Sequence, residues 1–370
     1  MLQRYSLQPF AVGRRVTLRA NSAWSPTVGG VNRRILTLLV ALVPIVAFGL
    51  LLSAVTVPFV GLGPGPTFDT LGEVEGKEVV DIEGAEVHPT TGHLNMTTVA
   101  QSDGITLGQA LALWISGRDQ LVPRALVYPP DKSKDEVDES NTKDFKRSED
   151  SAEYAALSYL KYPKSVTVES VTEPGPSAGK LEDGDAIDMV NDKPVATLEE
   201  FTAMLKTTKP GDQLVVDYRR KGGDLGTTTI TLGDNPDRDY GFLGVGVLEA
   251  PWADFTIDFN LANVGGPSAG LMFSLAVVDK LTTGDINGGK FVAGTGTIDD
   301  AGKVGPIGGI THKMVAAREA GATVFLVPAE NCVEANTGDT DGLTLLKVDT
   351  LATAVESLKT YSAGGEAPGC

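Results

Sequence analysis

Residues 265–278 read GGPSAGLMFSLAVV, and this stretch decides how the C-terminal part of the chain folds. Its glycines let the backbone approach a substrate closely, and Pro267 fits the first turn of a helix. The apolar run that follows predicts a buried helix, whose N-terminus directs N–H groups and a positive dipole end toward Ser268. Ser268 is therefore a candidate nucleophile, with Gly266 and Ala269 supporting an oxyanion site. The alternative is a serine that only caps the helix.

The same pentapeptide, GPSAG, also occurs at residues 175–179, where KLEDGD follows it. A polar turn does not present a serine to a substrate in the way that a buried helix does. We therefore expect the two copies to have different roles, and only the second to be catalytic.

A serine nucleophile needs a base. The sequence has three histidines (His88, His93 and His312), and none lies in a recognisable triad setting. Residues 302–318 read GKVGPIGGITHKMVAAR, which predicts a helix after the glycine pair. Lys313 lies near its apolar face, where burial lowers the pKa of an amine toward the working range of a base. We expect His312, one position away, to be a surface or substrate-side residue.

Three blocks carry a family resemblance: GPSAG at 266–270, GTG at 294–296 and PIGGITHK at 306–313. Together they resemble the proteolytic domain of Lon-type serine peptidases, over residues 240–360. The resemblance implies an α/β fold with a mixed sheet, Ser268 as nucleophile, Lys313 as base and Thr295 in contact with the lysine. The family often has Asp three residues before the nucleophile, where this chain has Gly265.

An alternating strand at 166–171 precedes the GDAIDMVN segment (184–191), a short helix at 198–206 and two further strands. With this order of elements, residues 155–236 resemble a PDZ domain of the bacterial type. PDZ domains bind an extended peptide as an added strand. The resemblance implies a groove between the strand at 166–171 and the helix, after a loop at 160–163. The residues expected to line it are Leu160, Tyr162, Phe201 and Leu205, for which core packing is the alternative.

The N-terminal segment predicts a membrane anchor. Residues 1–34 contain six arginines and no acidic residue, and residues 35–57 carry no charge. That uncharged length spans a bilayer core, and the arginines favour a cytoplasmic N-terminus with the later domains extracytoplasmic. A cleaved signal peptide is the rival reading. All 48 acidic residues lie beyond Arg34, which argues against a nucleic-acid partner.

Other segments complete the expected organisation. Residues 61–130 are expected to form a small membrane-proximal α/β element, residues 131–153 a charged linker or exposed helix start, and residues 361–370 a tail. Cys332 and Cys370 either form a disulfide in an oxidising compartment or remain free. Their spacing and that of the histidines indicate no metal site. The sequence contains no Gly-x-x-x-x-Gly-Lys-Ser/Thr loop, so neither ATP nor another cofactor is expected.

The whole chain thus resembles bacterial membrane-anchored proteins that join a PDZ domain to a Lon-type peptidase domain. We expect a multi-domain α/β protein that acts as an ATP-independent serine endopeptidase with a Ser–Lys dyad. Its substrates would be flexible or unfolded extracytoplasmic proteins, and its PDZ domain would bind peptide segments or C-termini. Two alternatives are an idle PDZ scaffold that binds peptides at the membrane surface and a latent protease that works only as a homo-oligomer.

Overall fold

The computed structural model describes residues 32–235, 237, 239–262 and 264–370. Helix α1 (Arg33–Ala54) has 22 residues, and it is the only helix of the described ranges long and apolar enough to cross a membrane. A signal sequence near the N-terminus passes the same test. Most of the predicted basic segment, residues 1–31, lies outside the described residues. The chain divides into two units, residues 1–52 and residues 53–370.

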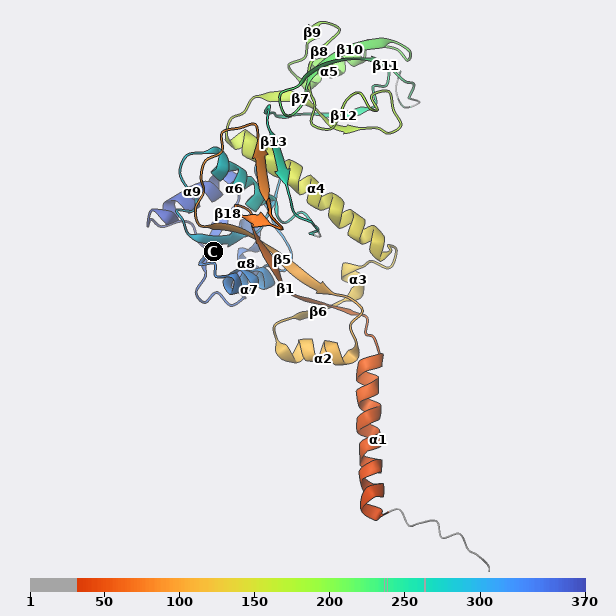
Figure 1. Ribbon diagram of the computed structural model, residues 1–370, viewed down its shortest axis with the longest axis vertical. Coiled ribbons are helices and arrows are strands. Elements are labelled where there is room, and N and C mark those ends of the chain that lie inside the picture. The colour runs from red at the N-terminus through yellow and green to blue at the C-terminus, as the bar shows by residue number, and fades with distance from the viewer. Residues whose placement is uncertain (1–31, 236, 238, 263) are drawn as a thin grey trace, which may run out of the picture. The chain divides into compact units, whose positions relative to one another are not determined.

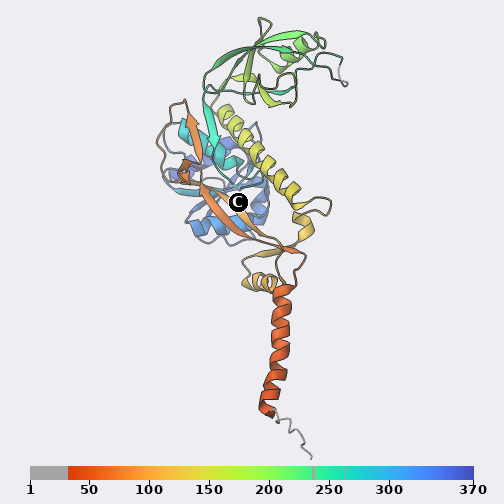
Figure 2. The ribbon, with the colours of Figure 1, turned by 45° about the vertical axis from the view of Figure 1, so that its right-hand side comes forward.

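A six-stranded mixed sheet with the order β18-β17-β14-β5-β1-β6 forms the centre of the larger domain (Figures 1 and 2). Its strands β5, β14, β17 and β18 are mutually parallel, whereas β1 is antiparallel to β5 and to β6. The predicted mixed sheet is confirmed. Its strands are β1 (Phe59–Asp69), β5 (His93–Ser102), β6 (Gln120–Pro123), β14 (Phe291–Gly294), β17 (Val324–Pro328) and β18 (Thr344–Val348).

The prediction of a separate membrane-proximal element at residues 61–130 is wrong. This segment supplies β1, β5 and β6 to the six-stranded sheet, with β5 paired directly to β14, about two hundred positions later in the chain. The segment also contains the helices α2 (Leu107–Ser116) and α3 (Arg124–Val127). The alternating pattern of the strands was visible in the sequence, but a pattern of apolar residues does not identify the partner strand.

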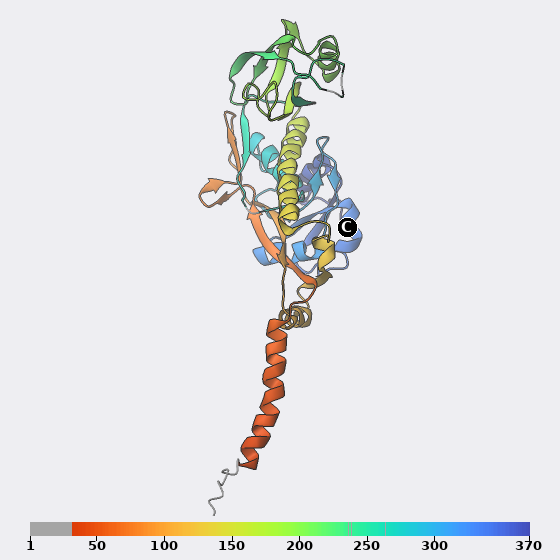
Figure 3. The ribbon, with the colours of Figure 1, turned by 90° about the vertical axis from the view of Figure 1, so that its right-hand side faces the viewer.

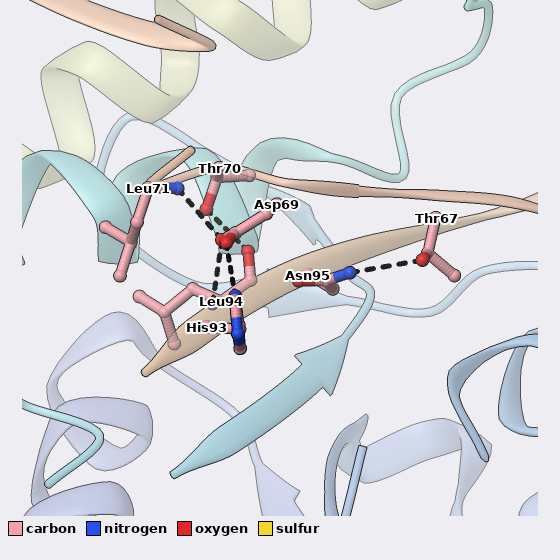
Figure 4. Close-up of polar contacts among 7 residues, drawn as sticks. All are labelled: Thr67, Asp69, Thr70, Leu71, His93, Leu94 and Asn95. Carbon is pink, nitrogen blue, oxygen red and sulfur yellow. Dashed lines mark hydrogen bonds and ion pairs between the residues drawn. The ribbon is translucent and has the colours of Figure 1, made fainter. Parts of the chain in front are cut away.

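One carboxylate fixes the meeting of β1 and β5, as Figure 4 shows. Asp69 Oδ1 accepts the backbone N–H groups of Leu71 and Leu94, both at 3.1 Å, and its Oδ2 lies 2.6 Å from His93 Nδ1. The Thr70 hydroxyl donates to Leu94 O at 2.7 Å. These bonds hold the start of β5 against the end of β1, and that strand pair forms one side of the candidate site.

The segment predicted as a charged linker or an exposed helix start, residues 131–153, belongs from Lys134 onward to the 26-residue helix α4 (Lys134–Tyr159), which packs beside the larger domain (Figure 3). Ser133 caps it in a reciprocal bond with Glu136. The helix buries one face against α6, whereas most of its charged side chains lie on the other face. The buried residues are Phe145, Ser148, Glu149, Ala152, Glu153, Ala155, Ala156 and Leu157. The sequence did not reveal this buried face, because small and polar residues form much of it.

The remaining helices of the larger domain cover its sheet. Helices α6 and α9 share one core with α4, and α7 belongs to a second core with the start of α8. The bounds are α6 (Gly270–Leu281), α7 (Ile310–Ala320), α8 (Cys332–Ala335) and α9 (Leu351–Ser362), with a 3₁₀ turn at Ala329–Asn331. Helix α6 is buried through its whole length up to Lys280, as its apolar sequence predicts.

Residues 164–251 form a second, smaller domain, called here the β7–β12 domain. Its sheet has the order β11-β10-β8-β7-β12, and the short β9 pairs with β8. The elements are β7 (Lys164–Val171), β8 (Ala186–Val190), β9 (Lys193–Pro194), α5 (Leu198–Leu205), β10 (Gln213–Arg219), β11 (Leu225–Thr231) and β12 (Val245–Pro251). The domain has its own apolar core. It extends beyond the predicted boundary at residue 236, because β12 pairs with β7 through seven registered residues.

Short strand pairs connect these parts. After β12, strand β13 (Thr256–Phe259) returns to the larger domain and pairs with β4 (Val80–Glu83). Two hairpins, β2 (Glu73–Val74) with β3 (Lys77–Glu78) and β15 (Thr297–Ile298) with β16 (Val304–Gly305), complete the described strands. The predicted tail at 361–370 is anchored, since Lys347 N–H donates to Pro368 O and Leu346 forms a bridge with Gly369.

Candidate active site

Three side chains that are far apart in the sequence meet at the start of α6. Lys313 Nζ lies 2.8 Å from Ser268 Oγ and 2.8 Å from Thr295 Oγ1. The Thr295 hydroxyl in turn donates to the backbone oxygen of Ser268 at 3.1 Å. The lysine therefore contacts the serine hydroxyl directly, while the threonine contacts both the amine and the serine backbone. This geometry is that of an amine held to take a proton from a hydroxyl.

Burial controls the ionisation of Lys313. Helix α7 begins after Gly309, whose φ of 70° is favourable for glycine, and it points Lys313 into the interior, where the residue is only 3% exposed. Desolvation of the charged form lowers the pKa of Lys313 from 10.5 to about 7. A substantial fraction of the amine is thus neutral near pH 7, as a general base requires.

The backbone around Ser268 is anchored to the strand end that carries Thr295. Gly296 N–H donates to Ser268 O at 3.0 Å, and Leu271 N–H donates to Gly296 O at 3.2 Å. Ala269 is the N-cap residue of α6, so the loop enters the helix immediately after the serine. The helix N-terminus thereby faces the position where an oxyanion would develop.

Helix α4 holds the other side of this loop, and sequence reasoning missed it. Asn141 O accepts the N–H of Gly266 at 2.9 Å, and the Ser148 hydroxyl donates to Pro267 O at 3.0 Å. The predicted oxyanion role of Gly266 is therefore wrong in this arrangement, because its N–H already has a partner in α4. No local pattern in residues 134–159 reveals a contact with a loop more than a hundred residues later.

A cavity of about 1080 Å³ opens at the Ser268 hydroxyl. The β1–β5 pair lines it with Phe68 and Met96, and α4 contributes Phe145. Leu261 and Val264 add apolar surface from the loop before the serine. The cavity is large enough for an extended peptide segment, and its lining combines these apolar side chains with polar ones such as Gln101 and Asn141.

Family models match two parts of the chain. The model of the PDZ domain matches residues 137–232, and the model of the Lon protease (S16) C-terminal proteolytic domain matches residues 262–358. The chain carries a PDZ domain and a Lon-type proteolytic domain. The second match contains Ser268, Thr295 and Lys313, and the first covers most of the β7–β12 domain.

Curated relatives of the chain include Lon proteases from several bacteria. The Lon proteases of Heliobacterium modesticaldum and Roseiflexus castenholzii are 44% and 46% identical to this chain over 66 residues, and that of Clostridioides difficile is 43% identical over 65 residues. Each alignment covers 18% of this chain and 8% of the relative. The chain therefore matches only a small part of the length of these proteases.

Solved structures similar to the chain include two PDZ domains of SdrC-like proteins. The one from Listeria monocytogenes is 24% identical, with a TM-score of 0.22, and covers 23% of this chain and 87% of its own. The one from Listeria innocua is 30% identical, with a TM-score of 0.20, and covers 23% of this chain and 92% of its own.

The groove predicted in the PDZ domain is wrong. Strand β7 is paired on both edges, with β8 and with β12, so it has no edge for a peptide strand. Phe201 is a buried core residue of the PDZ domain, and Leu205 packs against the same core. Leu160 and Tyr162 pack instead against the core of the proteolytic domain, where Tyr162 meets the ring of Phe255.

Two other predicted positions have structural roles. His312 is only 9% exposed, so the expectation of a surface residue is wrong, because α7 packs its His312 side against the domain. Ser177, the serine of the first GPSAG copy, is fully buried and its hydroxyl donates to Leu243 O at 2.7 Å. The first copy thus forms a turn of the PDZ domain in which the serine is buried and hydrogen-bonded to the backbone.

Cys332 and Cys370 form a disulfide. The bond joins the start of α8 to the last residue, and Asn336 Nδ2 donates to Cys370 O at 3.0 Å. Among the residues described, no group of three or more His, Cys, Asp or Glu residues is placed to hold a metal ion.

Proposed function

We propose that this protein is a membrane-anchored serine endopeptidase in which Ser268 is the nucleophile and Lys313 the general base. The observation that carries the proposal is the 2.8 Å contact between Lys313 Nζ and Ser268 Oγ at the mouth of the cavity. Desolvation of the lysine supports the same assignment, because a base must be neutral before it accepts a proton.

The proposed reaction has two halves. Neutral Lys313 takes the proton of the Ser268 hydroxyl as the oxygen attacks the peptide carbonyl carbon, and the carbonyl oxygen becomes an oxyanion. The ammonium then gives its proton to the leaving amine nitrogen as the C–N bond breaks, which leaves an acyl ester on Ser268. A water molecule attacks that ester while Lys313 accepts its proton, and the proton returns to Ser268 Oγ when the acid leaves.

The oxyanion is assigned to backbone N–H groups of Ser268 and Ala269 at the N-terminus of α6. A helix N-terminus presents N–H groups and a positive dipole end, and both favour a developing negative charge. Thr295 would act as a positioning residue, since its hydroxyl contacts the amine and the serine backbone together.

The anchor and the disulfide support an extracytoplasmic location. Helix α1 has the length and composition of a span, and arginines favour the cytoplasmic side. The Cys332–Cys370 disulfide fits an oxidising compartment beyond the membrane. With no nucleotide-binding loop in the sequence, we propose that substrates are flexible or unfolded proteins cleaved without ATP.

For the PDZ domain, we propose that peptides add to β12 rather than to β7. Strand β12 ends the sheet order, so one of its edges is unpaired within the sheet. It contacts α5, and Glu249 of β12 accepts the N–H of Leu198 at the start of that helix. A strand edge beside a helix is the arrangement in which PDZ domains take a peptide.

The test is cleavage of casein by the full-length protein in detergent without ATP. We expect activity in the wild type and none in Ser268→Ala or Lys313→Ala. Ser177→Ala, in the other GPSAG copy, and Lys303→Ala, in the turn before α7, are the matched controls and should remain active. Cleavage by Ser268→Ala at the wild-type rate would refute the nucleophile assignment, and inactivity of every form would favour a peptide-binding scaffold.

A further inference from the structure

The outward face of α2 is apolar. The helix has no charged residue, and Leu111, Trp114 and Ile115, at helical positions i, i+3 and i+4, are 42%, 70% and 69% exposed. Its opposite side packs through buried Ala110 against the sheet. A helix on the surface of a soluble domain normally turns polar residues outward, so we expect this apolar face to be covered by a partner.

The start of α2 is tied to the chain that leaves α1. Leu107 N–H donates to Val55 O at 2.8 Å, Val57 N–H donates to Ile105 O at 3.0 Å, and Thr56 forms a bridge with Thr106. Val55 is the residue after Ala54, where α1 ends. If α1 spans a bilayer, covalent connection keeps Val55 close to the point where the span leaves the lipid, and these bonds keep the first turn of α2 beside Val55.

The short helix α3 is also hydrogen-bonded to the segment that follows α1. Arg124 N–H, at the start of α3, donates to Pro58 O at 3.0 Å, and Leu126 on that helix is 75% exposed. Phe59 is paired with Pro123 and is 38% exposed. More than half of the exposed large hydrophobic residues described after Ala54 fall in these segments: Val55, Phe59, Leu111, Trp114, Ile115 and Leu126.

We propose that α2 lies in the interfacial layer of the lipid bilayer, with Trp114 and Ile115 inserted, and that it holds the proteolytic domain at the membrane surface. The occupant is lipid because the apolar residues gather where the chain leaves its span, and because tryptophan prefers the membrane–water interface. Helix α2 is well defined at both ends, because Thr106 forms a capping box at its N-terminus and Gly117 ends it in the left-handed conformation. This inference rests on the proposed anchoring by α1.

The test uses the full chain in phosphatidylcholine vesicles, with Trp24 replaced by Phe so that Trp114 and Trp252 remain. Brominated acyl chains quench tryptophans that reach the lipid. Trp252 is buried and donates to Gly184 O, so it serves as the unquenched reference. We expect a loss of emission in brominated vesicles relative to ordinary ones, and no such loss after Trp114→Phe. Equal emission in both kinds of vesicle would overturn the proposal.

A matched control places an exposed tryptophan elsewhere. Val333, on α8, is 83% exposed, and α8 contacts β17 near the opposite edge of the sheet from β6. Val333→Trp in the Trp114→Phe background should not be quenched, and quenching there equal to that of Trp114 would show unspecific contact with lipid and overturn the proposal.

Two further readouts separate the alternatives. Retention in the vesicles after alkaline carbonate extraction reports the span itself, so release of the chain refutes the anchor, whereas retention without quenching refutes the role of α2 alone. An emission maximum of Trp114 that shifts with protein concentration in detergent, without quenching by brominated lipid, would assign the face to a second copy of the chain and overturn the lipid assignment.

Discussion

Asn141 O accepts the N–H of Gly266 at 2.9 Å, so α4 is hydrogen-bonded to the loop that carries Ser268. The contact also explains the glycine before it, because a Cβ on Gly265 would lie 3.0 Å from Asn141 Cβ. Where Lon-type peptidases often have Asp, a side chain in this protein would make a tight contact with Asn141 of α4. The loop is held by the backbone of a helix instead, and the departure from the family pattern does not by itself indicate an idle site.

Replacing Gly265 with Ala should therefore impair catalysis. The added Cβ must shift the loop or Asn141 by a few tenths of an ångström. Because a displacement of about 1 Å in a catalytic group can lower activity about 100-fold, we expect this smaller shift to lower kcat for casein by up to about 10-fold, with little change in the melting temperature.

The control for this prediction is the double variant Gly265→Ala with Asn141→Gly. Removing the Asn141 side chain clears the position that the new Cβ would contact, while the backbone oxygen that holds Gly266 remains. Glycine within α4 costs about 1 kcal/mol of helix stability, but kcat should recover. A double variant as slow as the single one would show that crowding by Asn141 is not the cause.

The activity should depend on pH through Lys313. Burial lowers the pKa of its amine to about 7, and only the neutral amine accepts the serine proton. We expect kcat/KM for a peptide substrate to rise with pH through about 7 and then to level off. A profile that rises only near pH 10 would mean that the amine acting as the base is not desolvated. Lys313→Arg stays charged and should be inactive over the whole pH range.

The same burial links stability to pH. The folded-state pKa of Lys313 lies below that of an unfolded lysine, so the unfolded chain binds more protons between about pH 7 and pH 10. The contribution of this group to stability is present at high pH and is lost as the pH falls toward 7. Lys313→Met removes the ionisable amine and with it this pH dependence. As the pH falls from about 10 to about 7, the melting temperature of the wild type should therefore decrease relative to that of Lys313→Met. A difference that is constant with pH would contradict the shift.

Thr295 offers a test of positioning. Thr295→Val keeps the shape but removes the hydroxyl that contacts both Lys313 Nζ and Ser268 O. The loss of one buried hydrogen-bond partner costs about 1–3 kcal/mol, which corresponds to a fall in kcat of about 5- to 150-fold. Thr295→Ser keeps the hydroxyl and should retain most of the activity. Equal rates in the Val and Ser variants would mean that the hydroxyl does not position the amine.

The sequence allowed the Ser268 and Lys313 contact to be expected because each residue lies in a local pattern with a chemical meaning, and because the three blocks together resemble the Lon-type proteolytic domain. A glycine-rich entry into an apolar helix and a lysine beside an apolar helical face are both readable within about ten residues. The disulfide remained open, because spacing alone does not decide whether Cys332 and Cys370 meet. The structure joins them by laying the last residues along β18.

Contacts between distant segments could not be predicted in this way. Strand β12 lies after a turn that looked like the end of the PDZ domain, and only its pairing with β7 shows that it completes that sheet. The buried face of α4 contains alanines, serines and glutamates, so composition alone favoured a solvated segment. In both cases the decisive fact is which partner the segment meets, and apolar periodicity carries no information about that partner.

Removing the disulfide should destabilise the C-terminal end of the proteolytic domain. Cys332 and Cys370 are 38 positions apart, and closing a loop of this length restricts the unfolded chain by about 3–4 kcal/mol. We expect Cys332→Ser with Cys370→Ser, or the wild type treated with dithiothreitol, to melt several degrees lower. Dithiothreitol should not change the melting of the double variant, which separates loss of this bond from other effects of the reductant. The Asn336 bond to the last residue remains available in the double variant, so an unchanged melting temperature would mean that hydrogen bonds alone hold the tail on β18.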